Sequence, residues 1–193
     1  MFSIYIDSTV TLKIGLLNSK LKFLKFSDSD ELKTASILQA SIYNILKEFD
    51  IDFENIENFY VVLGPGSYTG LRMAKGLADI LELNNISVIP LYLHQVPYFA
   101  GISSGYFYSN AFKNEYFSYS WDNESTKIKL LKSVPENNFY TNDIKLLNKG
   151  VDVSELIQEK SDIVFEHLKQ KNINLPILYY RKIEEEFKGN QNE

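Results

Sequence analysis

The 193-residue sequence contains no cysteine, which excludes disulfide bonds, thiolate metal sites, iron–sulfur clusters and cysteine nucleophiles. It contains only two histidines, His94 and His167, and these lie far apart in the sequence. There is no His-x-x-x-His pair, so a two-histidine metal site would require the tertiary fold to bring the two rings together. We therefore expect no metal centre in this chain.

Arginine and positive charge are also scarce. Two arginines, Arg72 and Arg181, stand among 20 basic residues, and 25 acidic residues bring the formal net charge to −5. Arginine is the side chain best suited to bidentate phosphate contacts, and proteins that grip nucleic acid do so over a broad basic face. We expect that this chain alone binds RNA weakly.

The sequence lacks a long hydrophobic run as well. No apolar stretch approaches the roughly 20 residues that a membrane-spanning helix needs, and residues 1–7 contain no basic region followed by a long apolar stretch. Hydrophobic residues nevertheless make up 45% of the chain, which is enough to build a core. These features predict a cytoplasmic globular protein without membrane contact, built as one domain or two small lobes.

Short runs of β-branched or alternating apolar residues come first in the chain. Residues 2–7, 11–17 and 20–26 have this pattern and are separated by turn residues, so they predict an antiparallel three-stranded meander. N-cap candidates follow at residues 27–30. The apolar spacing beyond them predicts an amphipathic helix that ends near Phe49.

A second group of elements alternates strand and helix. Residues 59–63 form a continuous apolar run, typical of a strand buried on both faces, and residues 86–91 form another. The glycine-rich loop 64–70 and the helix-favouring segment 71–83 lie between them. This βββαβα order predicts the ribonuclease-H-like α/β fold, provided that the fourth strand pairs in parallel with the first.

The second half of the chain predicts a smaller lobe. We place the boundary near Gly101, which gives a first lobe over residues 1–101 and a second over residues 102–193. Residues 92–101 predict a helix that Pro97 starts or interrupts. The further expected elements are strands at 105–109, 115–121 and 127–132, a polar stretch at 136–150, a helix at 152–171 and an extended segment at 175–181.

The loop 64–70, with the sequence GPGSYTG, is the most informative stretch. A dinucleotide fingerprint needs a glycine where Thr69 stands, and a P-loop needs Lys-Ser or Lys-Thr where Leu71 and Arg72 stand, so neither motif is present. The loop still offers free amides at a helix N-terminus, which suits an anion. It equally suits a structural role, in which glycines allow close chain approach and Thr69 or Ser67 caps the helix.

Asp7, at the end of the first expected strand, is the other candidate for chemistry. A carboxylate followed by Ser8 and Thr9 at a β-turn is how actin-like ATPases place a magnesium or phosphate ligand, but a lone Asp at a strand end is more often a turn former. The loop also lacks the Gly-x-Ser-x-Gly spacing of a serine-hydrolase nucleophile elbow. The candidate anion site comprises Asp7, Gly64, Gly66, Ser67, Thr69, Gly70 and Arg72.

The expected helix over residues 70–83 carries an interaction signal. Its polar residues form one narrow stripe, so apolar residues cover most of its circumference, and one sheet cannot bury all of them. Either the first helix supplies the remaining cover, or a partner does. The candidate partner interface comprises Gly70, Met73, Ala74, Leu77, Ala78 and Leu81, with Ala35 and Ile42 of the first helix.

The stretch from Gly64 to Arg72, GPGSYTGLR, continues into AKGLA at residues 74–78 and resembles the signature of the bacterial TsaB (YeaZ) family. Two shorter stretches support the resemblance. Residues 4–8 are similar to the Ile-Asp-Thr start of that family, and residues 176–181 are similar to its C-terminal Pro-x-Tyr-Leu-Arg.

The resemblance implies an actin-like, two-lobed ASKHA fold and a role in making N6-threonylcarbamoyladenosine (t6A) next to the tRNA anticodon. It implies a non-catalytic subunit that dimerises with its larger paralogue TsaD, which transfers the threonylcarbamoyl group, while the ATPase TsaE joins the assembly. It further implies a homodimer when the chain is alone, contact with tRNA only through the complex, no firmly bound cofactor, and nucleotide binding only at the partner interface. The residues leave open an alternative, an ATPase or phosphotransferase that uses Asp7 and the glycine-rich loop.

The sequence departs from the family pattern in three places. Residues 110–115 occupy the position of the family's Asp-Ala-Arg-x-x-Glu segment, but Asn110 and Phe112 replace its Asp and Arg. Residues 32–35 read LKTA where a His-Thr or His-Ser pair is usual. The chain is also shorter than usual members, with a thin second lobe.

Overall fold

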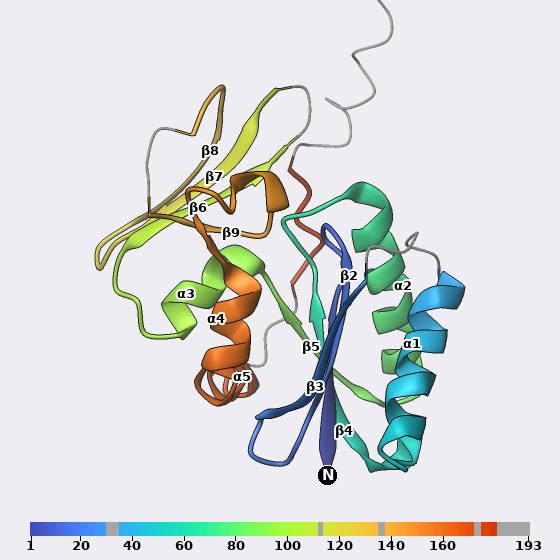
Figure 1. Cartoon of the computed structure of the whole chain (residues 1–193). Coiled ribbons are helices and arrows are strands. Elements are labelled where there is room, and N and C mark those ends of the chain that lie inside the picture. Colours follow the sequence, from blue (N-terminus) through green and yellow to red (C-terminus); the bar gives the residue numbers. More distant parts are fainter. Residues whose placement is uncertain (30–34, 112–113, 135–137, 172–174, 181–193) are drawn as a thin grey trace, which may run out of the picture.

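Two five-stranded mixed sheets organise the chain, one from each half of the sequence (Figure 1). The strand order is β3-β2-β1-β4-β5 in the first sheet and β10-β9-β6-β7-β8 in the second. The computed structural model describes residues 1–29, 35–111, 114–134, 138–171 and 175–180.

The first sheet has the predicted topology. Strands β1 (Phe2–Asp7), β2 (Leu12–Leu17) and β3 (Phe23–Ser29) form the antiparallel meander, and β4 (Ile56–Val62) and β5 (Ser87–Leu91) extend it. The fourth strand pairs in parallel with the first, which confirms the condition that the ribonuclease-H-like prediction required.

The third strand lies further along the chain than the sequence predicted. The turn after β2 continues to Lys22, whose carbonyl accepts a hydrogen bond from the amide of Asn18 (3.0 Å), and Leu21 has a positive φ of 57°. The strand therefore begins at Phe23 and includes residues 27–29, which were expected to cap a helix. The remaining cap candidate, Asp30, lies outside the described residues.

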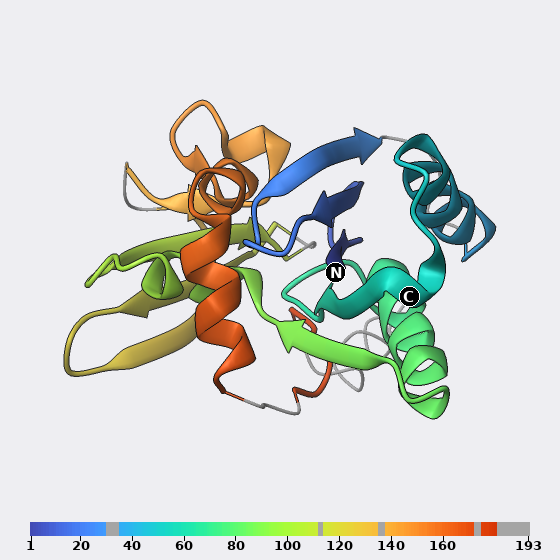
Figure 2. The ribbon, with the colours of Figure 1, turned by 90° about the horizontal axis from the view of Figure 1, so that it is seen from below.

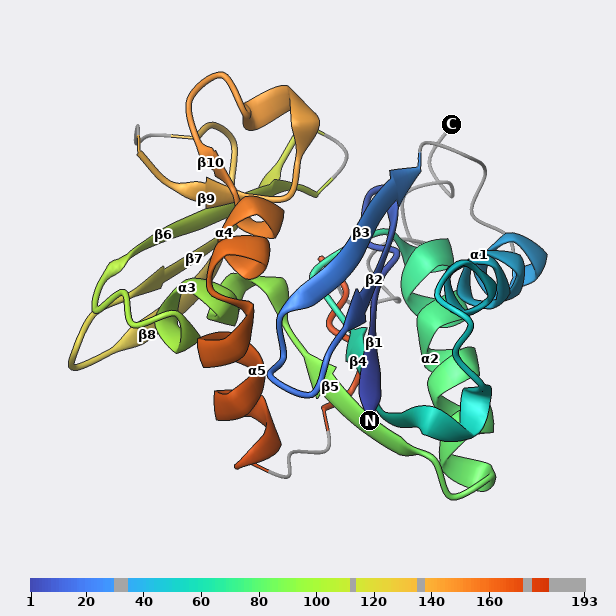
Figure 3. The same cartoon turned by 60° about the horizontal axis from the view of Figure 1, so that its bottom comes forward.

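Helices α1 (Ala35–Glu48) and α2 (Tyr68–Leu83) cover one face of the first sheet (Figure 3). Alternate residues of β1 point to opposite faces, so Ile4 and Ile6 pack under these helices. The predicted interface residues Ile42, Ala74, Ala78 and Leu81 are also buried in this cluster, and Gly70 is buried against the backbone of Ser8.

Of the two alternatives for the small-residue stripe, this burial favours cover within the chain itself. Ala74 has no exposed surface and belongs to the hydrophobic cluster formed by residues of the first sheet, α1 and α2. Met73 and Leu77 are half-buried at the edge of the same cluster, and the side chain of Ala35 lies outside the description. Only the outer residues of the two helices remain available to another molecule.

The second sheet begins with the predicted meander of three strands. Strands β6 (Gly105–Asn110), β7 (Tyr116–Trp121) and β8 (Thr126–Leu131) are antiparallel. Two short strands complete the sheet. Strand β9 (Tyr140–Thr141) lies within the expected polar stretch, and β10 (Val151–Asp152) lies just beyond it.

Three helices lie between the two sheets (Figure 2). Helix α3 (Val96–Phe99) is shorter than expected and follows a 3₁₀ turn, with Pro97 in its first turn. The single helix expected at 152–171 is two helices, α4 (Val153–Glu159) and α5 (Ser161–Lys169), because Lys160 leaves helical geometry.

Helix α5 joins the two halves in one hydrophobic cluster. The ring of Phe165 lies 4.4 Å from that of Tyr60 and 5.8 Å from that of Tyr5, between centroids, on the face of the first sheet opposite to α1 and α2. The division at residue 101 stays a prediction, and this cluster crosses it. Among the described helices, none combines the length and apolar composition that a membrane crossing needs.

We predict that Ala74→Glu destabilises the monomer itself. The charge would enter a dry core without a partner, so the free energy of unfolding should fall by about 4 kcal/mol or more. Gly76→Ala on the same helix is the matched control, since nothing lies within 4 Å of an added Cβ there, and it should stabilise by about 0.5–1 kcal/mol. Urea denaturation followed by circular dichroism measures both, and a folded Ala74→Glu of native stability contradicts this packing.

Candidate functional site

The loop 64–70 links β4 to α2 and lies directly against the turn between β1 and β2. The amide of Ser67 donates to the carbonyl of Thr9 (2.9 Å), and the Ser8 hydroxyl donates to the carbonyl of Gly70 (2.7 Å). A Cβ added at Gly70 would overlap the carbonyl oxygen of Ser8, so only glycine permits this approach.

The other side of the loop is covered by residues 175–180, which we call the clasp. The amide of Leu178 donates to the carbonyl of Leu63 (2.8 Å), and Gly66 forms a parallel bridge with Tyr179. Gly64 has a φ of 135°, and an added Cβ would overlap the carbonyl oxygen of Leu178. The clasp therefore packs directly against Gly64 and Gly66 of the loop.

The first turn of α2 shows which residue caps the helix and what Arg72 contacts. The hydroxyl of Ser67 accepts a hydrogen bond from the amide of Gly70 (3.3 Å), so Ser67 is the N-cap and the exposed Thr69 is not. The guanidinium of Arg72 lies 4.5 Å from the ring centroid of Tyr68, which in turn packs against Tyr179 of the clasp. Arg72 thus supports the closed loop by a cation–π contact.

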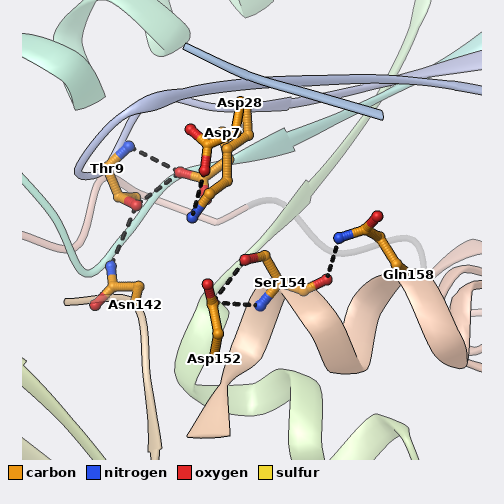
Figure 4. A network of polar contacts seen from close by, with 8 residues as sticks. Asp7, Thr9, Asp28, Asn142, Asp152, Ser154 and Gln158 are labelled. Carbon is orange, nitrogen blue, oxygen red and sulfur yellow. Dashed lines mark hydrogen bonds and ion pairs between the residues drawn. The ribbon is translucent and has the colours of Figure 1, made fainter. Parts of the chain in front are cut away.

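Asp7 acts as a turn former in this structure (Figure 4). Its carboxylate is 2% exposed, and Oδ1 accepts hydrogen bonds from the amide (2.8 Å) and the hydroxyl (2.6 Å) of Thr9. The side-chain amide of Asn142 donates to the Thr9 hydroxyl (3.2 Å) and to the carbonyl of Pro65 (3.4 Å). Asn142 therefore ties the second half of the chain to both the turn and the loop.

We call the contact region of the loop 64–70, the β1–β2 turn, the clasp and Asn142 the junction. Other charged groups near this junction also have structural partners. Asp152 caps α4 by accepting from the amide (2.8 Å) and hydroxyl (2.6 Å) of Ser154, and the buried Lys13 lies 3.9 Å from Asp28. Burial, followed by the nearby charge of Asp7, raises the pKa of Tyr5 well above its ordinary value, so this phenol stays neutral. Among the described residues, no three His, Cys, Asp or Glu side chains form a metal-binding group.

A small cavity of about 190 Å³ remains between the two halves of the chain. It is smaller than the roughly 300–1,000 Å³ of ordinary ligand pockets. It is lined by Thr9, Val10, Ser67, Ser109, Asn110, Asp143 and Tyr180.

A larger hollow of about 570 Å³ lies on the outside, between α1 and α2. Its walls are mainly apolar and include Tyr43, Leu46, Leu77 and Ile80. Tyr43 and Ile80 are exposed, as is Leu83 at the end of α2, so a hydrophobic surface stands open along this face.

The two histidines serve as packing groups. His94 is buried among aromatic rings, with the Tyr119 centroid at 4.4 Å, and its Nδ1 has no hydrogen-bond partner in the described chain. Burial lowers its pKa from 6.5 to about 3. His167 stacks on Phe99.

These features define a class: an α/β protein of two mixed sheets with the actin-like (ASKHA) fold, in which residues 175–180 of the chain pack against its glycine-rich loop. YeaZ from Pseudomonas aeruginosa is similar in structure, with a TM-score of 0.57 and 15% identity over 88% of this chain and 92% of that one. A protein described as uncharacterized, with similarity to peptidase YeaZ from Pseudomonas aeruginosa, aligns with a TM-score of 0.58 and 14% identity over 93% and 98% of the two chains. No protein-family profile matches the sequence. At these identities the likeness shows the fold alone.

We predict that Ser67→Ala lowers the free energy of unfolding by about 1 kcal/mol, because the helix loses its N-cap. Thr69→Ala should change it by less than about 0.5 kcal/mol, because this exposed side chain caps nothing. Chemical denaturation of the two variants decides between these caps, and a larger loss in Thr69→Ala would reverse the assignment.

We predict a loss of stability on acidification that depends on His94. Its pKa in the folded chain, about 3, lies below its ordinary value of 6.5, so between these values the unfolded chain binds a proton that the folded chain does not. The contribution is fully present above pH 6.5 and is lost as the pH falls toward 3. His94→Phe should flatten the dependence of the urea midpoint on pH in this window. An unchanged slope in the variant would show that other groups cause the loss.

Proposed function

We propose that this chain is a non-catalytic scaffold subunit of the t6A synthesis machinery, which pairs with the catalytic paralogue TsaD and is joined by the ATPase TsaE. When alone, the chain forms a homodimer through the same face that binds TsaD, the outer face of α1 and α2. It meets tRNA only through the complex, and nucleotide binds only at the partner interface. The observation that carries this proposal is the open hydrophobic hollow between α1 and α2.

That face has the properties of a protein interface. Its centre is apolar, with Tyr43 63% and Ile80 56% exposed, and charged groups such as Lys47 and Asp50 line the rim. The hollow could receive a side chain from a facing helix. Since the small residues of α2 face the core, the contact would use the outer residues Tyr43, Leu77, Ile80 and Leu83.

The closed junction supports a non-catalytic role over the alternative of an ATPase. An actin-like ATPase needs its first-strand carboxylate and its loops open to phosphate and magnesium. Here Asp7 is bonded to Thr9, the clasp covers the loop, and the cavity between the halves is about 190 Å³. ATP hydrolysis by the purified chain that is lost in Asp7→Asn would favour the ATPase.

We predict that Ile80→Glu weakens the association with TsaD at least about tenfold, because it places an unpaired charge in the apolar centre of the interface. Ile144→Glu is the matched control, since Ile144 is 62% exposed, close to the 56% of Ile80, but lies in the other half of the chain. Each variant is co-expressed with TsaD and measured by size-exclusion chromatography, with circular dichroism to check the fold.

The same pair of variants tests the homodimer by light scattering of the chain alone. If folded Ile80→Glu binds TsaD as the native chain does, the α1–α2 face is not the interface. If Ile144→Glu loses binding instead, the partner docks on the second half of the chain.

A further inference from the structure

One buried carboxylate oxygen beside the cavity between the two halves has no hydrogen-bond partner among the described residues. Asp143 is 8% exposed, and its Oδ1 accepts a hydrogen bond from the amide of Lys145 (2.9 Å). Its Oδ2 is buried and makes no hydrogen bond, although the side chain lines the cavity. A buried carboxylate without a counter-charge is costly, so this oxygen requires a partner that the described chain does not supply.

The other groups around Asp143 are oxygen donors of the kind that bind hard cations. Hydroxyls come from Thr9 and Ser67 beside the first sheet and from Ser109 on β6, where it shares a hydrogen bond with Tyr180 (2.7 Å). Burial, together with the charges of Asp143 and Asp7, raises the pKa of Tyr180, so its hydroxyl stays neutral. No basic side chain is among the described residues that line the cavity.

The size of the cavity limits what can enter. Its volume of about 190 Å³ equals that of roughly six waters in the liquid. This suits a small ion with part of its water shell and is too small for a nucleotide.

We propose that the cavity binds a small hard cation, with Asp143 supplying the charge and the hydroxyls of Thr9, Ser67 and Ser109 supplying neutral oxygens, directly or through water. A single carboxylate gives a low ligand charge, so binding is weak, in about the millimolar range. Because the ligands come from both halves of the chain, the ion would stabilise their contact. This inference does not rest on the proposed function, because it concerns the chain alone.

The test is thermal unfolding of the 193-residue chain in chlorides of sodium, potassium, magnesium and calcium. Tetramethylammonium chloride at equal ionic strength is the reference, because the four methyl groups of that cation keep oxygen ligands away from its charge. At about ten times the dissociation constant, a bound ion should raise Tm by about 3 to 6 °C. The four salts distinguish a monovalent from a divalent ion.

Asp143→Asn removes the charge but keeps an acceptor for the Lys145 amide, and it should abolish the rise in Tm. Asp122→Asn is the matched control, because Asp122 accepts amide hydrogen bonds in a comparable turn but is exposed. That variant should respond to the cation as the native chain does. Should Asp143→Asn fail to fold, Val10→Phe tests the same site by filling the cavity.

The proposal is overturned if no salt raises Tm above the tetramethylammonium reference. It is also overturned if Asp143→Asn, or Val10→Phe in its place, keeps the full rise. A rise that disappears equally in Asp122→Asn would indicate a general salt effect and would likewise overturn it.

Discussion

Direct contact between three backbone segments is the constraint on which this structure depends. The loop 64–70 lies between the β1–β2 turn and the clasp, and Gly64 and Gly70 have no room for a side chain. Backbone hydrogen bonds to Thr9 and from Leu178 hold the loop on both sides. The loop that the sequence left open to an anion packs against parts of the chain itself, and the neighbouring Asp7 and Asn142 both hydrogen-bond to Thr9 of the adjoining turn.

Much of the fold follows from periodicity, since strand and helix patterns require only local sequence. The βββαβα order was predictable because the continuous apolar run at residues 59–63, which forms the second half of β4, is typical of a buried central strand. The parallel pairing of β1 with β4 was the condition on which that prediction rested. The start of β3 was not, because the alternation of residues 20–26 continues through the turn at Leu21 without a glycine or proline. The break between α4 and α5 at Lys160 was hidden for a similar reason.

The candidate site was less predictable, because its contacts join distant positions. The sequence left the loop open between anion binding and close packing, and the positions of Leu178 beside Gly64 and of Ser8 beside Gly70 favour packing. Asn142 lies in a polar stretch with no motif, so no local signal could identify its bonds to Thr9 and Pro65. For α2, periodicity showed two apolar faces but not which one the chain covers itself. Ala74 faces inward and Ile80 outward.

The late position of the clasp in the sequence also affects the order in which the structure can form during translation. Leu63 and Leu178 are hydrogen-bonded, yet more than half of the chain separates them. Ribosomes make the N-terminal part first, so β1, β4 and the start of α2 emerge while one side of their connecting loop still faces water. Phe165, which packs under the first sheet, also arrives late. Only a chain translated through Tyr180 can complete the junction, so an interrupted translation product would retain an unfinished loop and an uncovered sheet face, both recognisable to the cell's quality-control proteases.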